Sequence, residues 1–239
     1  MERIAYGPDP SQFGELAGDG LSSDGAPGIA VLIHGGFWRD RYDRTLMHRI
    51  ANDLAAARWT TWNLEYRRLG NGGGYPATLE DVAAGIDALA GIDGLDLGGR
   101  IVAIGHSAGG QLAAWAATRE QPRVPVTAVV LQAGVLDLAL AYALGLSGGV
   151  VAELMDGGPE ERPAAYAAAS PRARLPLGVP ALVVTGGADG VVPPRISREF
   201  ADAARAAGDD VLLHEEPTEE HMGHVEPDNP LWRAVRAWL

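Results

Sequence analysis

The sequence predicts an α/β fold in which a mostly parallel central sheet is covered by helices on both faces. Short apolar runs that end in glycine alternate along the chain with alanine-rich segments of helical periodicity. The apolar runs are continuous, which indicates strands that are buried on both faces. A length of 239 residues fits one large domain better than two small ones. We therefore predict a single domain over residues 1–239.

The individual elements follow from these patterns. Predicted strands occupy residues 28–33, 60–65, 101–104, 126–131, 181–184 and 211–213. Predicted helices occupy residues 44–58, 108–119, 194–207 and 230–239, and a further helix opens at Thr78–Asp81 with a threonine cap and early acidic residues. This strand–helix alternation favours a parallel sheet.

One connection is much longer than the others. Residues 134–177 separate two predicted strands, which is too long for a bare loop in a compact domain. The segment contains helical patches at 136–144, 150–155 and 163–169. We expect a small helical cap inserted over one end of the sheet.

The composition excludes several kinds of chemistry. The chain has no cysteine, which excludes disulfides, thiolate zinc sites and a cysteine nucleophile. All 19 basic residues are arginine, so a Schiff-base lysine and a Walker-type phosphate loop are also excluded. Nothing in the sequence implies a metal or another cofactor.

Charge and hydropathy limit the partners. A formal net charge of −12 disfavours nucleic acid and anionic lipid. The N-terminal MERIAYGPDP lacks the pattern of a signal peptide, and no apolar run approaches the ~20 residues that span a membrane. We therefore expect a cytoplasmic protein with a small-molecule substrate and no nucleic-acid or membrane partner, and we leave a homodimer open.

The stretch GHSAGG carries the strongest functional signal. Gly105-His106-Ser107-Ala108-Gly109 has the form G-x-S-x-G and stands between a predicted strand and a predicted helix. Such a turn holds a serine with its oxygen exposed, and the glycines let strand and helix approach closely. The helix that follows supplies free amides and a positive dipole end where an oxyanion would form. Ser107 is therefore the predicted nucleophile, and a plain helix cap is the alternative.

A serine nucleophile needs a base, usually a histidine, and an acid that orients it. The loop after the last predicted strand holds His221 and His224, and both qualify as the base. Asp189 lies just past the preceding strand, and Asp137 is the spare candidate for the acid. The order Ser107, Asp189, His221 is that of α/β-hydrolase triads. The other four histidines are expected in bracing or ordinary structural places: His34, His48, His106 and His214.

The stretch LIHGGFWRD follows the first buried strand. Its two glycines allow the backbone amides of Gly36 and Phe37, with that of Ala108, to form an oxyanion hole. Aromatic side chains nearby are candidates for the substrate pocket: Trp38, Tyr66 and Tyr75.

Together these motifs resemble the α/β-hydrolase superfamily over nearly the full length. The stretches HGGFW, LEYRRLGNGGGYP, GHSAGGQLA, GGADGVVP and EEHMGHVEP are similar to those of small esterases and arylformamidases (kynurenine formamidases). In that group the spacing HMGHVEP places His221 in the catalytic position. Phe37 stands where related motifs have a third glycine, which suggests a small acyl group such as formyl or acetyl.

We therefore predict a serine hydrolase that cleaves a carboxylic ester or an activated amide through an acyl-enzyme. Three alternatives stay open: a kynurenine formamidase proper, an aminopeptidase-type serine hydrolase, and a non-catalytic binding protein of the same fold.

Overall fold

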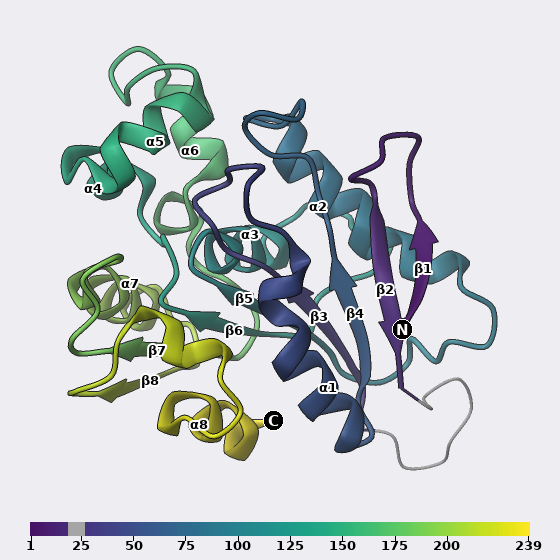
Figure 1. Cartoon of the computed structure of the whole chain (residues 1–239). Helices are drawn as coiled ribbons and strands as arrows, with labels where there is room; N and C mark the ends of the chain where they lie inside the picture. Colours follow the sequence, from purple (N-terminus) through teal and green to yellow (C-terminus); the bar gives the residue numbers. More distant parts are fainter. Residues whose placement is uncertain (19–26) are drawn as a thin grey trace.

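A central sheet organises the molecule (Figure 1). The computed structural model describes residues 1–18 and 27–239. Within this described part the sheet has eight strands in the order β1-β2-β4-β3-β5-β6-β7-β8. β1 and β2 pair antiparallel with each other, β2 pairs antiparallel with β4, and the remaining neighbours are parallel. The strands are β1 (Glu2–Ala5), β2 (Phe13–Ala17), β3 (Ile29–Ile33), β4 (Thr60–Leu64), β5 (Ile101–His106), β6 (Ala128–Gln132), β7 (Ala181–Gly186) and β8 (Val211–Glu216).

The predicted fold class is confirmed, and the six predicted strands correspond to β3 through β8. β1 and β2 have no counterpart among the predicted strands. β1 is mostly exposed, so it lacks the continuous apolar run by which the buried strands were recognised. β2 is largely buried, but its sequence FGELA is interrupted by a glycine and a glutamate, so it also lacks a continuous apolar run.

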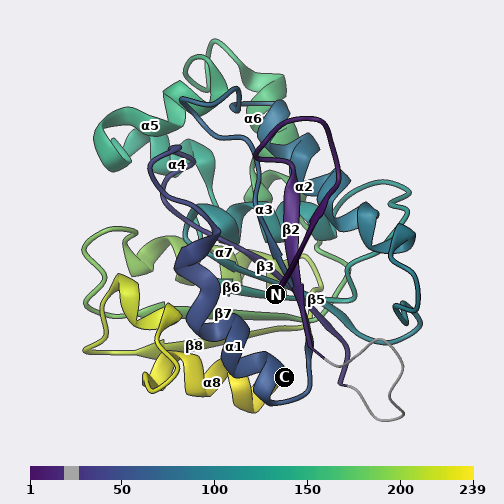
Figure 2. The same ribbon diagram turned by 45° about the vertical axis from the view of Figure 1, so that its right-hand side comes forward.

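Helices cover both faces, as Figures 1 and 2 show. Alternate residues of β3 point to opposite faces, so Val31 packs in one core and Leu32 in the other. Residues of α1 and α8 pack in the core that contains Leu32. Residues of α2, α3 and α7 pack in the core that contains Val31. Their bounds are α1 (His48–Ala56), α2 (Ala77–Asp87), α3 (Ala108–Ala117), α7 (Pro194–Ala206) and α8 (Pro230–Trp238).

Two helix starts differ from the prediction. The segment predicted as one helix from residue 44 begins with a short 3-10 turn, Arg44–Met47, before α1. Thr78 does not cap α2, because it lies one residue inside the helix and Pro76 occupies the cap position. The Thr78 hydroxyl accepts from the amide of Gly74 and donates to the carbonyl of Arg67 instead, so it fastens the preceding loop.

Three helices connect β6 to β7 and lie together at one end of the molecule, at the top of Figure 1: α4 (Leu138–Ala143), α5 (Leu146–Met155) and α6 (Pro163–Ala169). A short turn of 3-10 helix, Pro171–Arg174, follows them. The single-domain boundary and the role of this segment as a cap stay predictions.

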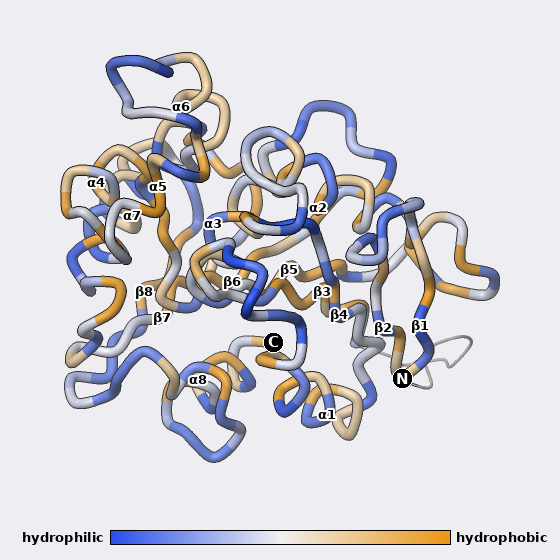
Figure 3. Tube along the Cα trace, turned by 45° about the horizontal axis from the view of Figure 1, so that its top comes forward, coloured by the Kyte–Doolittle hydropathy of each residue, from blue (hydrophilic) through white to orange (hydrophobic). Residues whose placement is uncertain are grey.

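The strand order places the loops that matter for function. The chain runs from β3 to β4 on one side and continues with β5 on the other side of β3. The sheet therefore reverses its winding between β3 and β5, and ligands bind at such a switch point, beyond the carboxyl ends of the strands. Figure 3 shows hydrophobic residues along the central strands β3 and β5. Among the described residues, no helix has the length and apolarity to cross a membrane.

Candidate active site

Ser107 lies on a strained turn between β5 and α3. Its backbone dihedrals are φ 57° and ψ −117°, a left-handed φ that non-glycine residues rarely adopt. The flanking glycines allow this close turn, because a Cβ on Gly105 would lie 2.0 Å from the carbonyl oxygen of Gly109. Although Ser107 occupies the cap position of α3, its side chain makes no capping hydrogen bond. The geometry therefore departs from that of a plain helix cap and leaves the hydroxyl available.

The loop after β3 forms a left-handed turn against Ser107. The amide of Arg39 donates to the carbonyl of Gly36 at 3.1 Å, and the central residues Phe37 and Trp38 have φ of 51° and 54°. We call residues 36–39 the Gly36 turn. Turns with two left-handed central residues usually contain glycine or asparagine. Two large aromatic residues are therefore held here in a strained conformation.

Gly35, the residue before the Gly36 turn, packs directly against Ser107. A Cβ on Gly35 would lie 2.9 Å from that of Ser107, so only glycine fits there. The backbone amides of Phe37 and Ala108 donate no hydrogen bond to any described residue. The structure thus brings the three predicted oxyanion-hole residues beside Ser107, and their role stays a prediction.

His221 and Asp189 form a buried pair. His221 Nδ1 lies 2.7 Å from Asp189 Oδ2, and the other carboxylate oxygen accepts from the amides of Val191 and Val192. Burial alone would raise the pKa of Asp189, but the hydrogen bonds from His221 and from these amides hold it below its usual value. The carboxylate therefore stays ionised and fixes the orientation of the imidazole.

A cavity of about 180 Å³ connects these groups. Ser107 and His221 line it together with Gly36 and Phe37, and no described residue in its wall carries a carboxylate. Its remaining wall is largely apolar and is formed by Tyr42, Leu46, His106, Val191 and Met222. Tyr42, Val191 and Met222 are also among the few exposed large apolar side chains, so they form an apolar rim around the mouth.

Two further histidines lie behind His221. The His106 ring is 4.6 Å from that of His221 and 5.8 Å from that of His224, and His106 Nε2 donates to the carbonyl of His221 at 3.1 Å. Both ring nitrogens of His224 are buried without a hydrogen-bond partner among the described residues. Burial, reinforced by the neighbouring His221, lowers the pKa of His224 to about 3 and that of His106 well below its usual value. No pattern in the sequence indicates this cluster.

A second buried histidine–carboxylate pair lies just before the Gly36 turn. His34 Nε2 is 3.1 Å from Glu65 Oε1, and His34 Nδ1 is 2.8 Å from the carbonyl of Gly35. Arg68 also pairs with Glu65 at 3.1 Å. Burial would raise the pKa of Glu65, but the hydrogen bond from His34 and the charge of Arg68 hold it low. These residues belong to HGGFW and LEYRR, two stretches that supported the resemblance.

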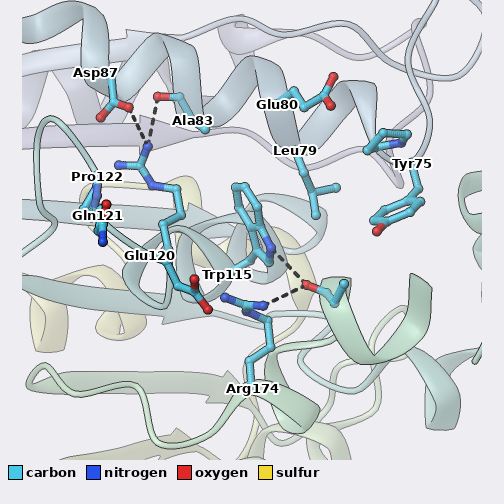
Figure 4. Close-up of a pocket in the computed structure, with 13 residues that line it drawn as sticks. Tyr75, Leu79, Glu80, Ala83, Asp87, Trp115, Glu120, Gln121, Pro122 and Arg174 are labelled. Carbon is cyan, nitrogen blue, oxygen red and sulfur yellow. Dashed lines mark hydrogen bonds and ion pairs between the residues drawn. The ribbon is translucent and has the colours of Figure 1, made fainter. Parts of the chain in front are cut away.

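Three aromatic residues predicted for the substrate pocket do not line the cavity. Trp38 and Tyr66 are fully buried in the core. Tyr66 stacks on His34 at 4.3 Å and donates to its carbonyl, so its hydroxyl is already engaged. Tyr75 lines a separate hollow with Trp115 on the surface of α2 and α3 (Figure 4). Aromatic residues are at least as often structural as substrate-binding, and here packing determines their direction.

The other candidate acid has a structural place. Asp137 caps α4, and its Oδ1 accepts from the amide of Leu140 at 3.0 Å. His48 pairs with Glu15 at 2.6 Å and His214 with Glu216 at 2.8 Å, and neither histidine lines the cavity. Of the candidate acids and bases, the structure therefore brings only Asp189 and His221 into a hydrogen-bonded pair beside Ser107.

A mostly parallel sheet with a serine on a strained strand–helix turn defines the α/β-hydrolase class. The model of the prolyl oligopeptidase family matches residues 64–239. The chain belongs to this family of serine hydrolases. No curated protein matches the chain.

Solved structures agree on the fold. A bifunctional GH43-CE protein of Bacteroides eggerthii is 22% identical with a TM-score of 0.83; the match covers 100% of this chain but 37% of that one. Esterase B of Lactobacillus rhamnosis is 18% identical with a TM-score of 0.80, covering 99% of this chain and 82% of that one. The butyrate-bound esterase Est2 of the planctomycete Thermogutta terrifontis is 21% identical with a TM-score of 0.75, and the match covers 99% of this chain and 91% of that one. The chain thus spans about a third of the length of the first of these proteins.

Proposed function

We propose that this serine hydrolase cleaves small carboxylic esters through an acyl-enzyme. One arrangement carries the proposal: Ser107 and the Asp189-bound His221 line the same small, apolar cavity. Ser107 Oγ bonds to the acyl carbon, and its proton passes to His221 Nε2 and then to the leaving alcohol. Water repeats the same steps and releases the acid. The amides of Phe37 and Ala108 stabilise the tetrahedral oxyanion.

The cavity favours a short apolar acyl group. Its volume of about 180 Å³ is below the roughly 300–1,000 Å³ of sites for drug-sized ligands. Phe37 and Leu46 in its wall offer contacts to alkyl groups and few to polar ones. The rim formed by Tyr42, Val191 and Met222 suits an apolar or aromatic leaving group. The structural neighbours that are esterases, one of them with butyrate bound, support the same chemistry.

Peptide hydrolysis is the second candidate, because the family model describes prolyl oligopeptidases. A peptidase that binds a free amino terminus needs carboxylates to pair with the ammonium. None of the described residues that line the cavity supplies one. We therefore rank ester cleavage first, and an activated formamide follows as a small-acyl variant of it.

The test combines labelling with a substrate panel. A fluorophosphonate probe should label the wild type at Ser107 and leave Ser107→Ala unlabelled. The enzyme should hydrolyse p-nitrophenyl acetate and p-nitrophenyl butyrate faster than p-nitrophenyl octanoate. It should also hydrolyse the two short esters faster than N-formylkynurenine or an aminoacyl p-nitroanilide. Removing a triad member typically lowers kcat by on the order of 10⁴–10⁶. Absent labelling, or full activity of Ser107→Ala, would overturn the proposal.

A further inference from the structure

A buried side-chain amide connects the Gly36 turn to the helix that carries Ser107. Gln111 lies in the first turn of α3, four residues after Ser107, and is fully buried. Its Oε1 accepts from Trp38 Nε1 at 3.1 Å. Its Nε2 donates to the carbonyl of Ala169, the last residue of α6, at 2.9 Å. One amide therefore joins the Gly36 turn, α3 and the segment between β6 and β7.

The Gly36 turn requires such a contact. Phe37 and Trp38 both have left-handed φ without being glycine, and strain of this kind persists only where the surroundings hold it in place. The backbone of Trp38 is held on one side, where its carbonyl accepts from the amide of Leu69 at 2.7 Å. On the other side, the hydrogen bond to Gln111 orients the fully buried indole of Trp38. Backbone and side chain together fix the residue next to Phe37.

We propose that Gln111 is a positioning residue for the oxyanion hole: its amide, hydrogen-bonded between Trp38 and Ala169, fixes the Gly36 turn relative to Ser107. The inference rests on the proposed function, because it takes the Phe37 amide as an oxyanion donor. Gln111 touches neither substrate nor the reacting atoms. Its loss should move the Phe37 amide, and small displacements of a catalytic group are costly in rate.

The chain offers two variants and a matched control. Gln111→Leu removes both hydrogen bonds at similar volume, and Trp38→Phe removes the indole N–H and replaces the bicyclic ring by a smaller one, a change of shape that the control below shares. Trp115 also lies on α3, and its indole donates to the carbonyl of Ala168 at 3.1 Å. Figure 4 shows Trp115 with a dashed line from its indole nitrogen. Trp115→Phe thus removes an equivalent bond between α3 and α6 that has no contact with the Gly36 turn.

Three measurements separate positioning from stability: kcat and KM on p-nitrophenyl acetate, the inhibition constant of a trifluoromethyl ketone, and the thermal melt. The ketone forms a tetrahedral adduct with Ser107, so its oxyanion needs the same donors. We expect Gln111→Leu and Trp38→Phe to lower kcat roughly 10–100-fold with KM within about threefold. The inhibition constant of the ketone should rise in parallel with the loss of kcat. The double variant should be no worse than the worse single variant, and Trp115→Phe should keep wild-type kinetics.

The outcomes distinguish the two proposals. If the fluorophosphonate probe does not label the wild type and the wild type hydrolyses no ester, the proposed function is overturned, and this inference with it. An active wild type with folded Gln111→Leu and Trp38→Phe variants that keep more than half of kcat overturns the inference alone. An equal loss in Trp115→Phe also overturns it, because the effect would then come from contact between α3 and α6. If Gln111→Leu does not fold, Trp38→Phe decides by the same criteria.

Discussion

Within the part of the chain that the structure describes, two buried histidine–carboxylate pairs lie at the carboxyl ends of the strands, and only one of them reaches the cavity. His221 meets Asp189 at 2.7 Å, and His34 meets Glu65 at 3.1 Å. The four residues are all at most 7% exposed. By residue type and burial alone, the pairs are nearly equivalent.

They differ in what the second ring nitrogen meets. His34 has an acceptor at each nitrogen, and it stacks on Tyr66 with no exposed surface. His221 uses only Nδ1 for its carboxylate and lines the cavity beside Ser107. A histidine–carboxylate pair therefore becomes a candidate catalytic device only where one nitrogen is left for substrate chemistry. The other pair serves as a buried brace next to the Gly36 turn, through the bond from His34 to the carbonyl of Gly35.

Replacing the carboxylate of the pair that we propose to be catalytic should have the largest effect. Asp189→Asn presents an amide N–H to His221 Nδ1 and so favours the wrong tautomer; kcat should fall about 10⁴-fold. The thermal melt should change far less than kcat, since the side-chain shape is conserved. Steady-state kinetics on p-nitrophenyl acetate check this. Asp137→Asn is the control and should keep wild-type kcat; a reversed result would move the acid to the end of β6.

Replacing the carboxylate of the bracing pair should instead destabilise the fold. Glu65→Leu leaves His34 and Arg68 buried without their anion, and breaking a buried ion pair in this way typically costs about 3–5 kcal/mol. Urea unfolding measures the loss. A variant as stable as the wild type, yet with kcat reduced as in Asp189→Asn, would show that this pair also has a catalytic role.

The buried histidines behind His221 predict a pH dependence of stability. His224 has a folded pKa of about 3 and an ordinary value near 6.5 when unfolded. Above pH ~6.5 the ring is neutral in both states, and below it the unfolded chain binds the additional proton. The free energy of unfolding should therefore fall as the pH drops from about 6.5 toward 3. The depressed pKa of His106 acts in the same direction.

The measurement compares the wild type with His224→Leu. Carboxylates throughout the chain also titrate in acid, so the difference between the two proteins carries the information. Urea unfolding at a series of pH values should show a shallower acid loss for the variant. Parallel curves for the two proteins would contradict a neutral, buried His224.

Local patterns were enough to predict the fold and part of the site. Continuous apolar runs identified the buried strands, and the glycines around Ser107 indicated the sharp turn. Contacts between residues that are far apart in the sequence are harder to predict from it. The sequence placed an aspartate after each of two strands, and only the tertiary arrangement distinguishes the helix cap Asp137 from the partner of His221.

Side-chain direction was the other limit. Trp38 and Tyr66 stand beside the motifs of the site, so they were expected in the substrate pocket. The left-handed backbone of the Gly36 turn and the bond to Gln111 place the Trp38 indole in the core. No local pattern encodes that turn, because its central positions hold aromatic residues where glycine or asparagine is usual.

The smallest predicted effect is on the stability that Asp137 contributes as a helix cap. Asp137 accepts from the amide of Leu140 as the N-cap of α4, and loss of such a cap costs about 0.5–2 kcal/mol. Asp137→Ala should therefore lower the free energy of unfolding in urea by about 1 kcal/mol, while kcat stays at the wild-type value. Asp137→Asn should recover most of this stability, because asparagine caps a helix about as well as aspartate. Equal losses in both variants would mean that the charge of Asp137, and not its capping oxygen, stabilises this segment.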